Sequence, residues 1–310
     1  MSDSPSVVVL VLNWNRERDT IEAVDSIRHL EYPRFSTLVL DNDSRSDSTA
    51  EIHRHCPGIE IVENGTNLGY AGGNNVGFRI ALERGADYCL VLNNDVTVDP
   101  PMLGQLVRAA EDDPSIAILG PRVYRHENPD TLFYTGWKID WRRWLFHRVA
   151  ATQNVEGLID VDFVQGCAML VRCAFLRECG LFDERFHLYC EDADLCVRAQ
   201  RVGHRTVELG SARVWHKGYG SSAKDSPLKT YYSIRNRLLF ISKHAPRKNR
   251  LLLRTQILTF DCGSLAFKAL KRMVSGKIRQ GWATLRALGR ALFDWMRGHY
   301  GAGPDWLFLE

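Results

Sequence analysis

Runs of apolar, often β-branched residues alternate with stretches of helical periodicity over the first 120 residues, and this order restricts the fold more than any other feature of the chain. The first run, residues 7–12, is unbroken, which is typical of a strand that a parallel sheet buries on both faces. Further strands are predicted at residues 35–40, 59–63 and 88–92, and helices at residues 18–30, 49–56 and 74–83. The alternation predicts an α/β fold with a doubly wound, mostly parallel central sheet.

The chain becomes less regular after this region. Residues 115–170 are rich in aromatic side chains, and the later pattern predicts strands at 161–171 and 206–209, a helical turn at 175–178 and a helix at 229–243. A chain of 310 residues has room for one large domain and an appendage. We therefore expect a catalytic domain at residues 1–242, with a nucleotide-binding half at 1–120 and an acceptor half at 121–242, and a basic helical tail at 243–310.

Charge is divided unequally between these two parts. The whole chain carries +3, but residues 243–310 hold thirteen Lys and Arg against four Asp and Glu, or +9, which leaves −6 for the rest. Apolar and basic residues alternate in this tail, as in helices that lie on an anionic bilayer. Its longest apolar stretch, residues 257–270, is interrupted by Asp261, Gly263 and Lys268, so it falls short of the roughly 20 residues of a membrane span. The other interpretation is that its apolar face packs on the body of the protein or on a second subunit.

The cysteines and the N-terminus indicate the compartment. The eight cysteines form no C-x-x-C pair and mostly have apolar neighbours, which is typical of buried free thiols in a reducing environment. Residues 1–6 are polar and the run at 7–12 is only as long as a strand, so no signal-peptide pattern is present. We expect a cytoplasmic protein at the inner face of the membrane. No nucleic-acid-binding motif accompanies the basic tail, so no nucleic-acid partner is expected.

Polar residues gather where the predicted strands end, and ligands of doubly wound folds bind at that edge of the sheet. Asp41 ends the second strand and could accept a hydrogen bond from a pyrimidine ring, although aspartate is also a common turn former. Residues 67–77 are rich in glycine and lead towards a helix N-terminus, which suits backbone contact with a nucleotide. They match neither a P-loop nor a dinucleotide fingerprint, and no G-x-G-x-x-G follows the first strand, which argues against a dehydrogenase.

The fourth predicted strand ends in Asn93, Asn94 and Asp95, a group suited to a divalent cation. The Asp95 carboxylate and the phosphates of a substrate would supply hard oxygen ligands, with the Asn93 amide oxygen as a weaker one. His216 follows a later strand and could complete the coordination through a ring nitrogen, which suits Mn²⁺ better than Mg²⁺. Each feature alone has a simpler interpretation, a turn for the Asn-Asn-Asp segment and a hydrogen-bonded histidine for His216.

Three acids, Glu191, Asp192 and Asp194, stand at the start of a predicted amphipathic helix. Helical spacing places Asp192 on the apolar face, and it places Glu191 and Asp194 on the opposite face with Arg198. Asp192 is therefore predicted to be the one acid that points inward. The helix dipole and the free amides at the N-terminus would keep it ionised, as a general base requires. The alternative is that Asp192 only caps the helix.

These residues and their order resemble the inverting family-2 glycosyltransferases with the GT-A fold, and in particular their bacterial rhamnosyltransferase-like branch. The resemblance is carried by residues 9–15, 39–44, 67–77, 90–95, 166–171, 182–184, 191–198 and 214–216 and by Tyr231, Tyr232, Arg235 and Asn236. Where the family has Asp-x-Asp, this chain has Asn93, Asn94 and Asp95. The metal site has one carboxylate fewer, so weak metal binding is expected without the donor.

The resemblance implies that Asp192 is the general base and that Asp95 and His216 hold a divalent cation, Mn²⁺ or Mg²⁺. It implies a nucleotide site that includes Leu12, Asn13, Asn15, Asp41, Gly69, Tyr70, Asn75, Asn93 and Asn94. The reaction would be the inverting transfer of a sugar from a nucleotide-diphosphate donor, with dTDP-L-rhamnose as the best match, to a hydroxyl of a glycan or lipid-linked acceptor.

Several alternatives stay open beside this function. The donor could be a UDP- or GDP-sugar, and the protein could be a nucleotidyltransferase or an inactive sugar-nucleotide-binding protein. A homo-oligomer is also possible. Trp137, Trp141 and Trp144 could shape an acceptor pocket, since aromatic faces pack on sugar rings, or could pack within the fold.

Overall fold

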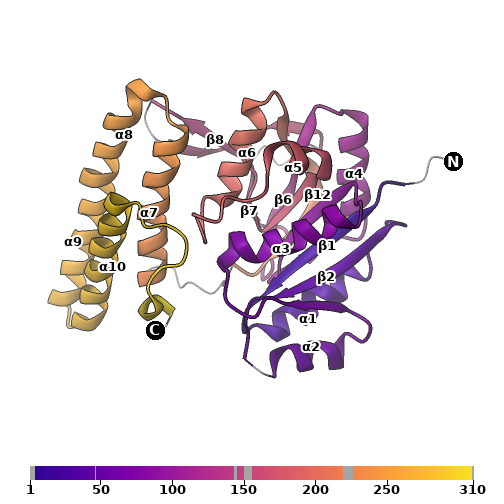
Figure 1. The fold of residues 1–310 in the computed structure, drawn as a ribbon, viewed down its shortest axis with the longest axis horizontal. Helices are drawn as coiled ribbons and strands as arrows, with labels where there is room; N and C mark the ends of the chain where they lie inside the picture. The colour runs from indigo at the N-terminus through magenta and orange to yellow at the C-terminus, as the bar shows by residue number, and fades with distance from the viewer. Residues whose placement is uncertain (1–3, 46, 143–144, 150–155, 219–225, 309–310) are drawn as a thin grey trace. The chain divides into compact units, whose positions relative to one another are not determined.

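Figure 1 shows a computed structural model of the chain, which describes residues 4–45, 47–142, 145–149, 156–218 and 226–308. Contacts within the chain divide it into two compact units. The first comprises residues 1–138, 147–183 and 191–218, and the second comprises residues 139–146, 184–190 and 219–310. The second unit thus takes in α7 (Pro227–His244) and two short segments that the sequence analysis assigned to the catalytic domain. The domain boundary at residue 242 stays a prediction.

The first unit is built on one large mixed sheet. Its strand order is β10-β12-β6-β11-β4-β1-β2-β3, with β5 paired to β12 and β7 paired to β6. Parallel pairing joins the strands β1 (Val7–Asn13), β2 (Phe35–Asp41), β3 (Glu60–Glu63) and β4 (Tyr88–Asn93). β11 (Ala168–Arg172) is antiparallel to both of its neighbours. The prediction of an α/β fold with a mostly parallel central sheet is confirmed.

The remaining strands extend the sheet or lie beside it. The parallel pair β6 (Ile116–Arg125) and β12 (Arg205–His216) continues the sheet beyond β11. Shorter strands pair with these two, namely β5 (Val96–Val98), β7 (Leu132–Tyr134) and β10 (Leu158–Asp160). A separate two-stranded sheet is formed by β8 (Trp137–Asp140) and β9 (Leu145–Arg148).

Helices cover both faces of the large sheet (Figure 1). One face carries α1 (Glu17–Ile27), α2 (Ser48–His55) and α4 (Met102–Asp112), and it buries Val7, Val9 and Val11 of β1. The other carries α3 (Gly69–Glu83), α5 (Cys173–Cys179) and α6 (Glu191–Arg201), and it buries Val8 and Leu10. Because side chains alternate between the faces of a strand, the unbroken apolar run at residues 7–12 supplies both layers. All eight cysteines are free thiols, and six of them are buried.

The glycine-rich segment is part of α3 rather than a loop that leads to it, so the prediction of a helix start at residue 74 is wrong. α3 begins at Gly69, which has a φ of +70°. A Cβ at Gly73 would lie 2.6 Å from Cδ1 of Leu12, and one at Gly77 would lie 2.7 Å from Cδ2 of Leu10. The two glycines therefore let the helix backbone approach β1 closely. This packing requirement involves residues far apart in sequence, so the local pattern does not reveal it.

Two of the differences from the sequence-based strand predictions have a physical reason in the structure. The sequence does not predict β6, because Gly120 and Pro121 interrupt its apolar pattern. A Cβ at Gly120 would lie 2.7 Å from Cβ of Val164, and Pro121, which has no N–H to donate, coincides with an irregularity in the pairing with β12. Of the predicted strand at residues 161–171, only β11 joins the sheet core, because the chain before it turns away to pair with Trp137.

The second unit is helical, as predicted for the tail. α7 is followed by α8 (Arg250–Gln256), a π-helical segment (Ile257–Asp261), α9 (Cys262–Val274) and α10 (Ile278–Arg297), with 3-10 turns at Arg247–Asn249 and Asp305–Phe308. α10 packs against both α7 and α9. Across the described ranges, no helix combines the length and the apolar character that crossing a bilayer requires.

Candidate active site

Asp192 lies in the first turn of α6, and backbone amides hold both of its carboxylate oxygens. Oδ2 accepts a hydrogen bond from the amide of Gly166 (3.0 Å), and Oδ1 accepts one from the amide of Ala193 (2.7 Å). Burial raises the pKa of Asp192 above the usual aspartate value, and the two amides oppose this shift. The carboxylate therefore takes up a proton more readily than an exposed aspartate does, which suits a general base. The capping interpretation also has support, because the side chain satisfies one helix amide.

The prediction that Asp192 alone points inward is wrong. Glu191 and Asp194 are buried, whereas Asp192 is partly exposed. Asp194 pairs with Arg198 (2.9 Å), and Arg198 also donates hydrogen bonds to the carbonyl groups of residues 179–181. The segment after α5 therefore covers the helix face that periodicity assigned to solvent. Helical spacing shows which residues share a face, but it does not show what covers that face.

Gly166, which the sequence analysis did not single out as a functional residue, connects Asp192 with α3. Its carbonyl oxygen accepts a hydrogen bond from the Tyr70 hydroxyl (2.6 Å), and its amide donates to Asp192. A Cβ at this position would lie 3.4 Å from Cβ of Asp192 and 3.4 Å from the Tyr70 ring. Burial, followed by the charges of nearby acids, raises the pKa of Tyr70 well above its usual value, so the hydroxyl stays protonated and donates. The backbone of Gly166 thus joins Tyr70 and Asp192 through one hydrogen bond to each.

Glu191 adds a second buried acid next to Asp192 and leads to a testable prediction. Its Oε2 is buried without a hydrogen-bond partner. Burial, followed by the charge of Asp192, raises the pKa of Glu191 well above its usual value. The folded protein therefore retains a proton that the unfolded chain releases. For this reason the free energy of unfolding falls as the pH rises above the unfolded pKa of about 4.3, with a slope that approaches about 1.4 kcal/mol per pH unit.

We expect Glu191→Gln to remove this pH dependence, because the amide cannot ionise. Urea unfolding at about pH 5 and about pH 8 should show a smaller loss of stability in the variant than in the wild type. Glu83→Gln, the same chemical change at an exposed position of α3, is the control and should behave like the wild type. Equal losses in all three proteins would show that Glu191 ionises normally.

Asp95 and His216 form a second group, at the carboxyl end of β4. β5 pairs with β12 so that His216 lies opposite Val96, which brings the two side chains together. Nε2 of His216 is 3.0 Å from Oδ1 of Asp95. Burial lowers the pKa of His216, but the hydrogen bond with Asp95 and the neighbouring Cys167 thiol outweigh this effect and raise it to about 10. The two side chains thus form a buried ion pair.

The same group offers oxygen atoms for a cation. Oδ2 of Asp95 and Oδ1 of Asn93 are buried and have no hydrogen-bond partner. Buried polar atoms nearly always have one, and carboxylate and amide oxygens are ligands that Mn²⁺ and Mg²⁺ accept. The described residues include no cluster of three His, Cys, Asp or Glu side chains that could hold a metal ion. Asp95 and Asn93 therefore offer oxygen ligands to a cation that takes its remaining ligands from a substrate, and His216 can join them once the cation has displaced its proton.

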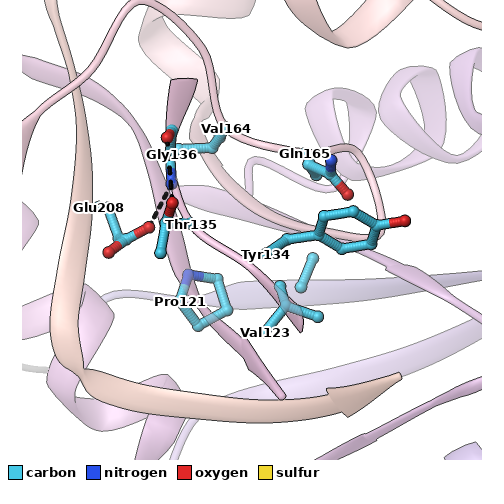
Figure 2. A pocket seen from close by; sticks show the side chains of 9 residues that line it. Pro121, Val123, Tyr134, Thr135, Gly136, Val164, Gln165 and Glu208 are labelled. Carbon is cyan, nitrogen blue, oxygen red and sulfur yellow. Dashed lines mark hydrogen bonds between the residues drawn. The ribbon is translucent and has the colours of Figure 1, made fainter. Parts of the chain in front are cut away.

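A small pocket of about 10 Å³ lies next to both groups (Figure 2). Gln165 and Tyr134 lie close together on one side of it, and Glu208 lies on the other. Gln165 directly precedes Gly166, and the ring of Tyr134 is 6.4 Å from that of His216. Pockets for small molecules usually measure about 300–1,000 Å³. This pocket is far smaller, with about the room that one water molecule needs.

Asn13 and Asp41, both predicted to contact the nucleotide, lie opposite each other at the ends of β1 and β2 and are buried. Nδ2 of Asn13 donates to Oδ1 of Asp41 (2.8 Å), and Oδ1 of Asn13 accepts from the Thr20 hydroxyl (2.8 Å). Oδ2 of Asp41 accepts from the amide of Ser44 (2.9 Å). These bonds hold the turn after the strand, as the turn-former interpretation of Asp41 expects. Contact of either residue with a nucleotide stays a prediction.

Other predicted nucleotide contacts also have partners within the protein. The amide group of Asn75 donates to the carbonyl of Phe182 (2.9 Å) and accepts from its N–H (3.0 Å), so it anchors the segment after α5. Nδ2 of Asn94 donates to the Thr20 hydroxyl (3.1 Å). Asn15 is exposed, and its Oδ1 accepts from a backbone amide (2.9 Å). Leu12, Gly69 and Tyr70 lie where α3 meets β1 and Gly166. Their roles towards a nucleotide stay predictions.

Two of the three tryptophans pack on other aromatic rings. Trp137 stacks on Phe163 in the first unit, with ring centroids 5.8 Å apart. Trp141 stacks on Phe240 in the second unit, also at 5.8 Å. Trp144 lies outside the described residues. The interpretation that these rings pack within the fold has direct support, and their contact with an acceptor stays a prediction.

Comparisons with known proteins show the family of the chain. The family model of glycosyl transferase family 2 matches residues 6–180, more than half of the chain. The chain is 24% identical over 292 residues to the low-salt glycan biosynthesis hexosyltransferase Agl10 of Haloferax volcanii, an alignment that covers 90% of this chain and 84% of that protein. It is 27% identical over 214 residues to the N-acetylglucosaminyl-diphospho-decaprenol L-rhamnosyltransferase of Mycobacterium tuberculosis, which covers 61% of this chain and 69% of that protein.

A known protein structure has a similar fold. The chain is similar to the mannosyltransferase of Pyrobaculum calidifontis in complex with GDP-Man and Mn²⁺, with a TM-score of 0.57 and 14% identity over 94% of this chain and 88% of that one. At this identity the likeness shows the fold alone, and it confirms the predicted GT-A architecture. The chain belongs to glycosyl transferase family 2, in the rhamnosyltransferase-like branch, and is a glycosyltransferase.

Proposed function

We propose that the protein transfers a sugar, with inversion, from a nucleotide-diphosphate donor to a hydroxyl group of a glycan or lipid-linked acceptor. The observation that carries this proposal is that two consecutive residues join the two halves of the site. The amide of Gly166 donates a hydrogen bond to the Asp192 carboxylate (3.0 Å), and the carbonyl oxygen of Cys167 accepts one from the amide of Asn93 (2.9 Å), which lies beside the Asp95 pair. A proton acceptor and a cation-binding group therefore lie on either side of one short segment.

In this reaction Asp192 accepts the proton of the acceptor hydroxyl. The hydroxyl oxygen forms a bond to the anomeric carbon while the bond from that carbon to the diphosphate oxygen breaks on the opposite side. The Gly166 amide keeps the Asp192 carboxylate oriented towards the incoming hydroxyl. A divalent cation held by Asp95, Asn93 and His216 would supply electrostatic stabilisation of the departing diphosphate.

The donor that we propose is dTDP-L-rhamnose, because the chain resembles rhamnosyltransferases. The name of the mycobacterial relative gives its acceptor as a sugar on a diphospho-decaprenol lipid, which supports a lipid-linked acceptor for this enzyme. A GDP-sugar is the alternative donor, since the structural relative from Pyrobaculum binds GDP-Man. Product release assays with dTDP-rhamnose, UDP-sugars and GDP-sugars separate these donors.

Metal-dependent binding of the nucleotide tests the cation site. We expect chelation with EDTA to weaken binding of the matching nucleoside diphosphate by at least about 10-fold, since a cation that bridges the diphosphate is worth several kcal/mol. Asp95→Asn, which keeps the size but removes the charge, should bind the nucleotide equally with and without Mn²⁺. Titration calorimetry measures both effects. Asp112→Asn, at an exposed position of α4, is the matched control and should retain the metal dependence.

The result that counts against this site is equal nucleotide affinity of the wild-type protein with Mn²⁺ and with EDTA. The chelation experiment and the Asp95→Asn experiment are independent, because chelation acts on the unaltered protein. A lower stability of Asp95→Asn, which leaves the charge of His216 without its partner, therefore does not obscure the outcome.

We further propose that the second unit holds the enzyme on an anionic membrane, at the cytoplasmic face where such lipids and a lipid-linked acceptor meet. Eleven of the thirteen large apolar side chains that are exposed in the described residues lie between Leu251 and Met296. Phe267, Leu270 and Val274 recur at three- and four-residue spacing on α9, so they share one face. Exposed apolar surface of this extent marks a binding site.

The charge of this surface indicates whether it binds a membrane or a second copy of the protein. The exposed residues Lys268, Lys271 and Lys277 lie among the apolar side chains. Their charges attract the anionic head groups of lipids, by about 1 kcal/mol for each residue near the surface. The same charges would repel the identical surface of a second copy. An anionic bilayer is therefore the better match, and self-association is an outcome that the test below detects.

A further inference from the structure

Residues 184–190 lead directly into Glu191 and Asp192, and their backbone adopts an unfavourable conformation. His187, Tyr189 and Cys190 have φ angles of 61°, 70° and 73°. For a residue other than glycine, such a conformation costs on the order of 1 kcal/mol or more. It persists only where surrounding contacts impose it. The contacts that hold this segment therefore determine how the chain enters α6.

Arg235 of α7 supplies the first set of these contacts. Its side chain is fully buried, and Nη2 donates to the carbonyl oxygens of Arg185 (3.2 Å) and Phe186 (3.1 Å). Nη1 donates to the carbonyl oxygen of Gly301 (2.8 Å), whose amide donates to Arg185 (2.9 Å). In the part of the chain that the structure describes, Arg235 meets carbonyls, the Tyr231 hydroxyl and an amide oxygen rather than a carboxylate. A buried cation without a counter-ion is costly, and the carbonyl contacts compensate its burial together with the Tyr231 and Tyr232 rings, whose centroids lie 5.0 and 4.9 Å from the guanidinium.

Asn236 supplies the second set. Its Nδ2 lies within hydrogen-bond distance of three carbonyl oxygens, those of Phe186 (2.7 Å), Leu188 (2.6 Å) and Tyr189 (3.0 Å). Its Oδ1 accepts a hydrogen bond from Nε of Arg235 (3.0 Å), which orients the amide. The two consecutive side chains thus bind four of the five carbonyl groups at residues 185–189.

We propose that Arg235 and Asn236, which we call the clamp, are positioning residues for the general base. They hold residues 185–189 in the strained conformation from which α6 starts, and so they set the position of the Asp192 carboxylate at the Gly166 amide. They act through the chain, and they do not touch substrate. This inference rests on the proposed role of Asp192, and it gives a function to the Tyr-Tyr-x-x-Arg-Asn segment (residues 231–236) that the transfer chemistry leaves without one.

The first test replaces the amide that binds three carbonyls. Asn236→Asp keeps the size of the side chain but places acceptor atoms against the carbonyl oxygens. We expect kcat to fall by about 10- to 100-fold, the cost of a base displaced by about 1 Å, while nucleotide affinity changes by less than about twofold. Asn249→Asp is the matched control, because the amide of Asn249 donates to the Trp141 carbonyl (3.0 Å) in the same unit but not to residues 184–190.

A double-mutant cycle separates positioning from a purely structural role. Adding Asn236→Asp to Asp192→Asn should cause no further loss of kcat, because the clamp acts only through the base. Arg235→Lys keeps the charge but not the fork of donors, and it should follow the same pattern with its rate normalised to folded protein. Arg235→Lys also tests the positioning role if Asn236→Asp folds poorly.

Three outcomes are informative. Equal losses of kcat from Asn236→Asp in the wild-type and Asp192→Asn backgrounds would overturn the positioning role, since the clamp would then act elsewhere. A fully active Asn236→Asp protein beside an impaired Asp192→Asn protein would overturn this inference alone. A fully active Asp192→Asn protein would overturn the proposed function, and the clamp with it.

Discussion

Asp192→Asn is expected to lower kcat by about 10²- to 10⁴-fold, the usual contribution of a general base. Asparagine has the size of aspartate and still accepts one of the two backbone hydrogen bonds that hold Asp192, but it cannot take a proton from the acceptor. Nucleotide affinity should change by less than about twofold, because the base does not hold the diphosphate. Initial rates of transfer and titration calorimetry with Mn²⁺ measure the two quantities.

The pH dependence of the wild-type enzyme provides a second readout. Only the ionised carboxylate accepts a proton, so activity is lost as the pH falls through the pKa of Asp192. Because burial raises that pKa, the loss should occur at a higher pH than for an exposed aspartate, and Asp192→Asn should lack this limb of the profile. Asp112→Asn is the control for the substitution itself. Unchanged turnover of Asp192→Asn would remove Asp192 from its role.

Replacing Phe260, Phe267, Val274 and Trp282 together by serine is expected to weaken binding to anionic vesicles by at least about 100-fold. These side chains have exposed fractions of 75%, 69%, 91% and 60%, so their removal should disturb the interior little. Even about 1 kcal/mol from each, less than the value for full burial of such a side chain, sums to a loss of this size. Sedimentation with phosphatidylglycerol vesicles measures it, and added salt should weaken the binding of the wild-type protein.

The matched control uses exposed apolar residues of the first unit. Leu158→Ser combined with Val202→Ser, at 40% and 50% exposure, should bind vesicles like the wild type. The membrane proposal is contradicted if the fourfold variant binds vesicles as tightly as the wild type. It is also contradicted if the wild type forms a dimer that the variant breaks and neither protein binds vesicles. That result would assign the surface to a second copy.

The sequence by itself determined the features that depend on neighbouring residues. The alternation over the first 120 residues predicted β1 to β4 and α1 to α3 in their order but not β5, α4 or β6, and the unbroken run at residues 7–12 predicted a strand buried on both faces, as β1 is. The acids at the start of α6 and the helical tail were likewise visible in local patterns. These predictions hold because periodicity and helix-terminal preferences act over a few residues.

Only the tertiary structure decided the features that join distant segments. The glycines of α3 became part of a helix because β1 lies against them, and Glu191 and Asp194 became buried because other segments cover their helix face. The contact of Gly166 with Asp192 spans 26 residues, and that of Asn236 with Phe186 spans 50. Periodicity carries no information about such contacts, since they depend on which surfaces the folded chain brings together.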